Sequence, residues 1–202
     1  MSVKQDLTIN KGKTFKQKVR WETTPIVYKP ITGISQAAPA LITCVAHGVP
    51  DGWRVAVTST KGMTQINAAN RPPKGKDYHE AAVKTSSTIE LNDVNAAEYS
   101  AYLSGGYIQY NTPVDLTGYT ARMSLRASDK PGTVELLRLD TATGGIVIDN
   151  SVKTVTIVIA AAVTAALTFS KALYDLEMIN AAGEVFLMLS GAVIVINEIT
   201  ST

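Results

Sequence analysis

Apolar and polar residues alternate over short stretches along most of the chain. In residues 118–126 every second side chain from Tyr119 to Leu125 is apolar, and Thr, Arg and Ser lie between them. Residues 174–178 repeat this alternation with acidic residues at the polar positions. A period of two is typical of a strand that buries one face and exposes the other. The same pattern predicts strands at residues 6–10, 14–22, 41–46, 53–59, 88–92, 118–126, 133–139, 146–149, 154–159, 173–179, 184–189 and 192–197.

Clusters of Gly, Pro, Asn and Asp separate the predicted strands. The segments Asp129–Gly132 and Asn180–Gly183 each join two of them, as hairpin turns do. Residues 160–168 are the only helix-favouring stretch, and they are too few for more than a connector. The sequence therefore predicts an all-β fold class, a sandwich or a small barrel.

One apolar stretch raises the question of a membrane span. Residues 154–170 contain no charge, but their 17 residues are at the lower limit for a spanning helix. The spacing of Val155, Ile157 and Ile159 instead favours a strand that runs into an Ala-rich turn. Charged residues interrupt positions 1–13, where a secretion signal would be apolar. We therefore expect a soluble protein without a membrane span, made in the cytoplasm.

The charge is small overall and unevenly distributed. Hydrophobic residues make up 46% of the 202 residues and charged residues 18%, which excludes disorder for most of the chain. Residues 1–30 carry seven basic and two acidic side chains, whereas residues 110–202 carry six basic and nine acidic ones. The basic start could be a nucleic-acid-binding arm, but the apolar residues Phe15, Val19 and Trp21 favour a half-buried strand. We expect no nucleic-acid partner, and the acidic final segment is the expected partner of this strand.

Residues suited to catalysis or metal binding are scarce. The single cysteine, Cys44, lies in a predicted strand and is expected to be buried, and His47 lies in a Gly/Pro turn. His79 has no companion that would complete a metal site, and Asn92–Asn95 lacks the later glutamate of a calcium loop. Motifs for hydrolases, zinc proteases, phosphate loops and dinucleotide folds are absent from the sequence. We predict no catalytic residue, cofactor or metal, and an undetected hydrolase remains an alternative.

Two segments are candidate interfaces. Residues 68–77 form a polar excursion with the basic residues Arg71, Lys74 and Lys76, which are interpreted either as a surface loop without a role or as a contact loop. Four tyrosines, Tyr99, Tyr102, Tyr107 and Tyr110, surround Gly105 and Gly106. They could form an interface anchor or a sugar-binding surface, or they could pack at a domain junction.

Residues 31–107 resemble the first catalytic-cysteine half-domain of ubiquitin-activating enzymes, a module whose likeness occurs in structural proteins of tailed bacteriophages. The matching residues are His47–Gly52, Val55–Val57, Lys61–Asn67, Tyr78, Ile89–Leu91, Val94 and Ser104–Gly106. Cys44 precedes this motif, so the resemblance implies no catalytic cysteine. The family pattern also lacks the excursion at residues 68–77.

Residues 6–22 joined with residues 114–199 are similar to the immunoglobulin-like N-terminal domain of upper baseplate proteins of siphophages. The matching residues are Gly12, Phe15, Val19, Val114–Tyr119, Val147–Asp149, Tyr174–Glu177, Gly183–Val185 and Gly191–Ile196. About eighty residues separate the first matching strands from Val114. An insertion of the small β-domain into a loop of the sandwich would explain this separation.

The two resemblances imply an immunoglobulin-like β-sandwich from residues 1–30 and 110–202, with an inserted small β-barrel-like domain at residues 31–109. They also imply a non-enzymatic structural or adaptor protein of a tailed-phage virion, in the tail, neck or baseplate, made in the host cytoplasm. The expected partners are other virion proteins, including fibre components, in a homo-oligomer or symmetric assembly. The alternatives are a capsid decoration protein and an adhesin that binds a host glycan.

Overall fold

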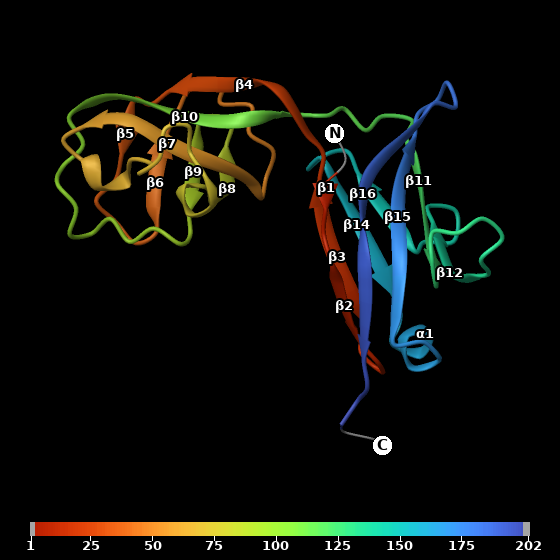
Figure 1. The fold of residues 1–202 in the computed structure, drawn as a ribbon. Helices are drawn as coiled ribbons and strands as arrows, with labels where there is room; N and C mark the ends of the chain where they lie inside the picture. The colour runs from red at the N-terminus through yellow and green to blue at the C-terminus, as the bar shows by residue number, and fades with distance from the viewer. Residues whose placement is uncertain (1–2, 200–202) are drawn as a thin grey trace. The chain divides into compact units, whose positions relative to one another are not determined.

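The computed structural model describes residues 3–199 and is all-β, with about 51% strand and 6% helix. Contacts divide the chain into two compact units (Figure 1). The first unit consists of the chain up to Trp21 and from Asp115 onward, and the second unit is Glu22–Val114. The chain therefore passes between the units twice, and the first unit contains both ends of the chain.

The first unit contains two sheets. The larger sheet has the order β1-β16-β15-β11-β12, and β2 also pairs with β16. Its strands are β1 (Val3–Lys4), β2 (Leu7–Asn10), β11 (Thr120–Arg126), β12 (Glu135–Asp140), β15 (Lys171–Ile179) and β16 (Val185–Ile196). The smaller sheet has the order β13-β14-β3, from β13 (Ile146–Asp149), β14 (Thr154–Ile159) and β3 (Phe15–Arg20). A short helix, α1 (Ala161–Ala165), follows β14.

Alternating apolar residues of both sheets form the buried positions of the first unit. Met123 and Leu125 of β11 and Leu176 of β15 are almost completely buried, as are Ile157 of β14 and Val193 of β16. These residues follow the period of two from which the strands were predicted. The unit is β-sandwich-like, and its immunoglobulin-like connectivity stays a prediction.

The second unit is a seven-stranded sheet with the order β4-β10-β7-β8-β9-β6-β5. Its strands are β4 (Glu22–Pro30), β5 (Gly33–Ile34), β6 (Ala40–Thr43), β7 (Trp53–Lys61), β8 (His79–Thr85), β9 (Thr88–Leu91) and β10 (Ser104–Pro113). Two 3₁₀ helices, η1 (Thr64–Ile66) and η2 (Gly75–Asp77), lie between β7 and β8. One core cluster includes Ile42 of β6, Trp53 of β7 and Ile108 of β10, so the sheet encloses its own apolar interior.

The sequence-based boundary between the units needs correction. Residues 22–30 were assigned to the sandwich, but β4 pairs with β10 along its length, from Glu22 opposite Pro113 to Pro30 opposite Tyr107. Residues 22–30 and 110–114 therefore belong to the second unit. β4 was not predicted because it contains Pro25 and Pro30. As an edge strand, β4 tolerates these prolines.

One strand replaces two predicted ones at the end of the first unit. Residues 185–196 form the single strand β16, which continues through Gly191. β1 pairs with Leu189 and Ser190, whereas β2 pairs with β16 from Val193 onward, so the edge partner changes at Gly191. Gly191 is therefore a point where the backbone of Gln5 approaches β16 closely, and not the end of a strand.

The acidic final segment is only in part the partner of the basic N-terminal strand. β1 and β2 pair in parallel with β16, but β3 pairs with β14, which contains no charged residue. One ion pair joins the two ends of the chain, between Lys13 Nζ and Glu198 Oε1 at 3.0 Å. Apolar faces and backbone pairing, rather than charge, therefore determine where β3 lies. Within residues 3–199, no helix has the length and apolar character needed to cross a membrane.

Candidate interaction surfaces

A basic loop, defined as residues 68–77, lies between η1 and β8 and ends with η2. The carboxylate of Asp77 holds it together by accepting hydrogen bonds from the backbone N–H groups of Ala69 at 3.0 Å and Lys74 at 2.8 Å. The backbone and side-chain amides of Asn70 donate to the same carboxylate at 3.3 and 2.9 Å. The hydrogen bond from Lys74, followed by that from the Asn70 side chain, lowers the pKa of Asp77. The basic loop is therefore ordered around one ionised carboxylate.

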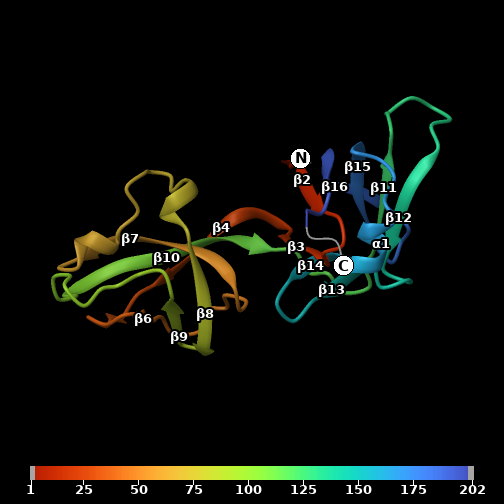
Figure 2. The same cartoon turned by 90° about the horizontal axis from the view of Figure 1, so that it is seen from below.

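The three basic residues of this loop are exposed. Arg71, Lys74 and Lys76 are all exposed, whereas Asp77 is buried. None of the three forms an ion pair with another residue of the described range 3–199. In Figure 2 the yellow-to-olive connection between β7 and β8 rises beyond the strands of the second unit. The three basic residues among the predicted contact residues therefore lie on one protruding loop.

Most of the predicted tyrosine cluster packs inward. Tyr99 and Tyr102 are partly buried against the core of the second unit, and the Tyr102 hydroxyl lies 3.0 Å from the carbonyl oxygen of Ile31. Tyr110 is buried, and its hydroxyl donates to the His47 carbonyl at 2.6 Å. Burial, followed by the nearby Cys44, raises the pKa of Tyr110. These tyrosines do not form one exposed surface.

Tyr107 is the exposed member of the cluster. It lies beside Tyr28, which was not among the predicted contact residues. Tyr107 is 45% exposed and Tyr28 is 55% exposed. Their ring centroids lie 6.3 Å apart at 87°, an edge-to-face arrangement. The register of β4 against β10 brings them together, because Gln109 pairs with Tyr28 and Pro30 with Tyr107. Tyr28 was missed because β4 itself was missed.

The histidines and the cysteine occupy structural positions in the second unit. His47 is buried, its Nδ1 accepts the backbone N–H of Val49 at 3.0 Å, and its Nε2 lies 2.9 Å from the Thr85 carbonyl. Because Nδ1 accepts, Nε2 carries the proton and donates to Thr85. Cys44 is fully buried, as expected, and this burial raises its pKa. His47 thus fixes a turn, as its Gly/Pro surroundings indicated.

His79 pairs with an acidic residue on a neighbouring turn. Its Nδ1 lies 2.7 Å from Oδ2 of Asp93, and the Asp93 side chain is mostly exposed. Across residues 3–199, no group of three or more His, Cys, Asp or Glu side chains is arranged to hold a metal ion.

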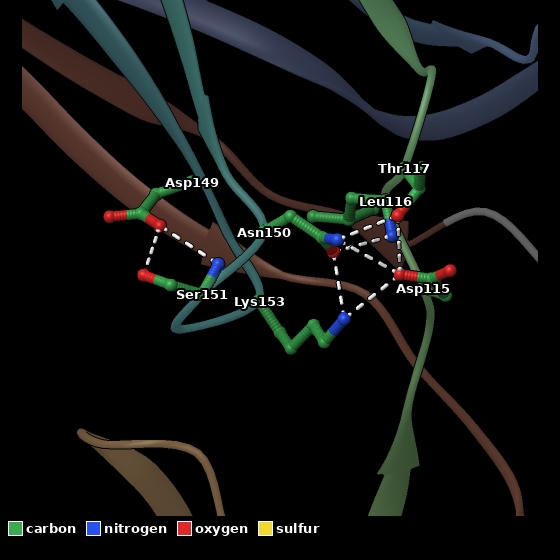
Figure 3. A network of polar contacts seen from close by, with 7 residues as sticks. All are labelled: Asp115, Leu116, Thr117, Asp149, Asn150, Ser151 and Lys153. Atoms are coloured by element: carbon green, nitrogen blue, oxygen red, sulfur yellow. Dashed lines mark hydrogen bonds and ion pairs between the residues drawn. The ribbon is translucent and has the colours of Figure 1, made fainter.

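The Asp115–Tyr119 motif is held by a polar network in the first unit (Figure 3). The side-chain amide of Asn150 donates to Asp115 Oδ1 at 3.0 Å, and Lys153 Nζ donates to the same oxygen at 2.9 Å. The Leu116 backbone N–H donates to Asn150 Oδ1 at 2.8 Å. These contacts, led by the hydrogen bond from Lys153, lower the pKa of Asp115 to about 2. The network attaches the start of β11 to the turn between β13 and β14.

Among the described residues, the larger sheet of the first unit has an open strand edge. Between Val185 and Met188, no described strand pairs with β16 on the side away from β15. Val185, Phe186 and Leu187 are 49%, 36% and 43% exposed, and Phe186 also contacts Trp21 with ring centroids 5.6 Å apart. An unpaired edge with exposed apolar side chains is a template for another strand.

The polar face of the same sheet forms a groove of about 730 Å³. Charges of opposite sign face each other across the strands: Arg122 donates to Glu177 at 2.6 Å, and Arg126 lies 3.8 Å from Glu135. Such cross-strand pairs stabilise a sheet. Because its charged side chains largely satisfy one another, we interpret this groove as the solvated face of the sheet.

No family model matches the chain, and no curated protein matches it.

Proposed function

We propose that this protein is a non-enzymatic structural or adaptor component of a tailed-phage virion, located in the tail, neck or baseplate. In this role it joins other virion proteins through protein–protein contacts in a symmetric assembly. The virion assignment is supported by the two sequence resemblances, to the phage-associated half-domain and to the baseplate immunoglobulin-like domain. The contact role is supported by the surfaces of the two units.

The open edge of β16 is the observation that carries the contact role. Its residues Val185–Leu187 expose apolar side chains, and no strand within residues 3–199 pairs with them on the side away from β15. Soluble proteins usually protect such edges with charge, proline or a covering segment. Strand addition by a partner would pair the backbone groups and cover the apolar side chains.

A charge on this edge is predicted to reduce incorporation into particles. Leu187→Lys adds a positive charge at a position that is 43% exposed, so the fold is retained while partner contact is disfavoured. Ile194→Lys is the matched control, because Ile194 lies in the same strand and is 41% exposed, but β2 already covers its edge. A phage lacking the gene is complemented with each variant, and quantitative mass spectrometry measures the protein in purified particles.

We expect Leu187→Lys to be recovered at about one tenth of the wild-type amount or less, the effect of losing about 1.4 kcal/mol of association free energy. Ile194→Lys should be recovered at the wild-type amount. Equal recovery of both variants would show that the edge of β16 makes no assembly contact.

A further inference from the structure

The basic loop carries positive charge that the second unit does not neutralise. Elsewhere in this unit, Arg54 pairs with Glu22 through a bidentate contact of Nε with Oε1 and Nη2 with Oε2, and Lys84 pairs with Glu90 at 2.7 Å. Arg71, Lys74 and Lys76 have no such partner within the described residues 3–199. The acidic residue of the loop, Asp77, accepts hydrogen bonds from backbone N–H groups and from the Asn70 amide, and it forms no ion pair with the three basic residues. Three cationic side chains are therefore available to a partner.

The loop presents these cations from an ordered backbone. Asp77 binds donors near both ends of the loop, Ala69 and Asn70 at the start and Lys74 after the two prolines. The Ala68 N–H also donates to the Val57 carbonyl of β7 at 2.7 Å, which fixes the loop to the sheet. A binding loop that is ordered in advance loses less conformational entropy when a partner docks.

The charge distribution favours a compact acidic partner over a nucleic acid. The second unit has seven basic and seven acidic residues between positions 22 and 114, so its net charge is zero. Nucleic-acid-binding domains instead carry an excess of positive charge along a continuous stripe that follows the phosphates. We propose that Arg71, Lys74 and Lys76 dock the second unit onto an acidic surface of a neighbouring protein.

This inference rests on the proposed assembly role and names the chemistry of one partner. The experiment measures binding of the full chain to a fluorescein-labelled poly-L-glutamate peptide by fluorescence anisotropy at low salt. A single-stranded oligothymidylate of equal charge is measured in parallel. The test variant is R71A/K74A/K76A, and the matched control is K29A/K61A/K84A, which removes the same charge from the same unit outside the loop.

The loop variant should bind the peptide about tenfold more weakly than wild type, because three surface ion pairs of a few tenths to one kcal/mol each are lost. The control variant should bind the peptide with an affinity within about twofold of wild type. Wild-type binding should weaken as salt is added. Equal losses in both variants would show an effect of net charge alone. Tighter binding of the oligothymidylate than of the peptide, or no peptide binding at low salt, would also overturn the inference.

A second variant separates the order of the loop from its charge. Asp77→Asn keeps all three cations but replaces an acceptor oxygen with a donor facing the N–H groups of the loop. It should weaken peptide binding although the net positive charge rises, and circular dichroism should show that the fold is retained. Unchanged or stronger binding would contradict the role of the ordered loop. All these outcomes are independent of Leu187→Lys, because β16 belongs to the other unit.

Discussion

Individual aspartates of this protein order turns through the hydrogen bonds they accept. Asp77 binds the N–H groups of the basic loop, and Asp149 accepts the Ser151 N–H at 2.9 Å. Asp115 instead accepts from the side chains of Lys153 and Asn150. In each case donors to the charged form lower the pKa of the carboxyl group. The ionised carboxylates therefore help to hold the turns in place.

Asp115 gives a pH-dependent prediction. Its pKa is about 2 in the folded protein, below the value of about 3.9 expected in an unfolded chain. The resulting stabilisation is present above the unfolded pKa and is lost as the pH falls from about 4 toward 2. Asp115→Asn should therefore destabilise the protein at neutral pH, and this difference from wild type should shrink across that pH range.

Urea unfolding at several pH values measures this difference. Asp129→Asn, at an exposed turn outside the network, is the control and should follow wild type. A destabilisation by Asp115→Asn that stays constant down to pH 2 would show that the lowered pKa of Asp115 does not contribute to stability.

The candidate contact residues show how far single residues could be identified from sequence. The polar composition of residues 68–77 correctly indicated a protruding loop with exposed Arg71, Lys74 and Lys76. The tyrosines were different, because their spacing along the chain does not reveal which face of a strand each one occupies. Tyr107 is exposed and Tyr110 is buried, and the exposed neighbour Tyr28 lies on a strand that the sequence did not reveal.

At the scale of elements, strands with a clear apolar pattern were predictable, whereas β4 and β10, which contain proline or glycine, were not. β13 and β14 have the predicted bounds because both are short runs rich in Ile and Val, and the turn at residues 150–153 separates them. β10 was missed because Gly105 and Gly106 lie near its start and Pro113 ends it, which weakens the strand pattern. The pairing of β1 and β2 with β16 depends on contacts between the two ends of the chain, which no local pattern encodes.

Gly191 gives a prediction for the strand β16. A Cβ at this position would collide with the carbonyl oxygen of Gln5, which also accepts the Tyr174 hydroxyl at 2.7 Å. Gly191→Ala should therefore destabilise the first unit by about 1–3 kcal/mol, the range for overpacking. Gly33→Ala is the control. A Cβ at residue 33 would lie 3.5 Å from Thr43, which is an ordinary contact, so the free energy of unfolding of this variant should change little. Urea unfolding measures the stability of both variants. A Gly191→Ala variant as stable as wild type would contradict the close approach at Gly191.

At the scale of the whole molecule, the chain forms two units, one of which contains both chain ends. The second unit has its own core around Trp53, and the first unit has buried positions from two sheets. The order of the resembling segments along the chain indicated this organisation, although the boundary moved to Trp21 and Val114 once β4 and β10 were seen to pair. The apolar edge of β16 on one unit and the basic loop on the other are the two separate surfaces on which the proposed contacts depend.

Mass spectrometry of purified phage particles, separated into head and tail fractions, tests the proposed virion role most directly. The particles come from a phage that encodes this chain, and the protein is quantified in each fraction relative to known structural proteins. We predict that the protein is found in the tail fraction in a fixed ratio to those proteins. Its absence from the particles, at a time when the infected cell contains it, would contradict the proposed function.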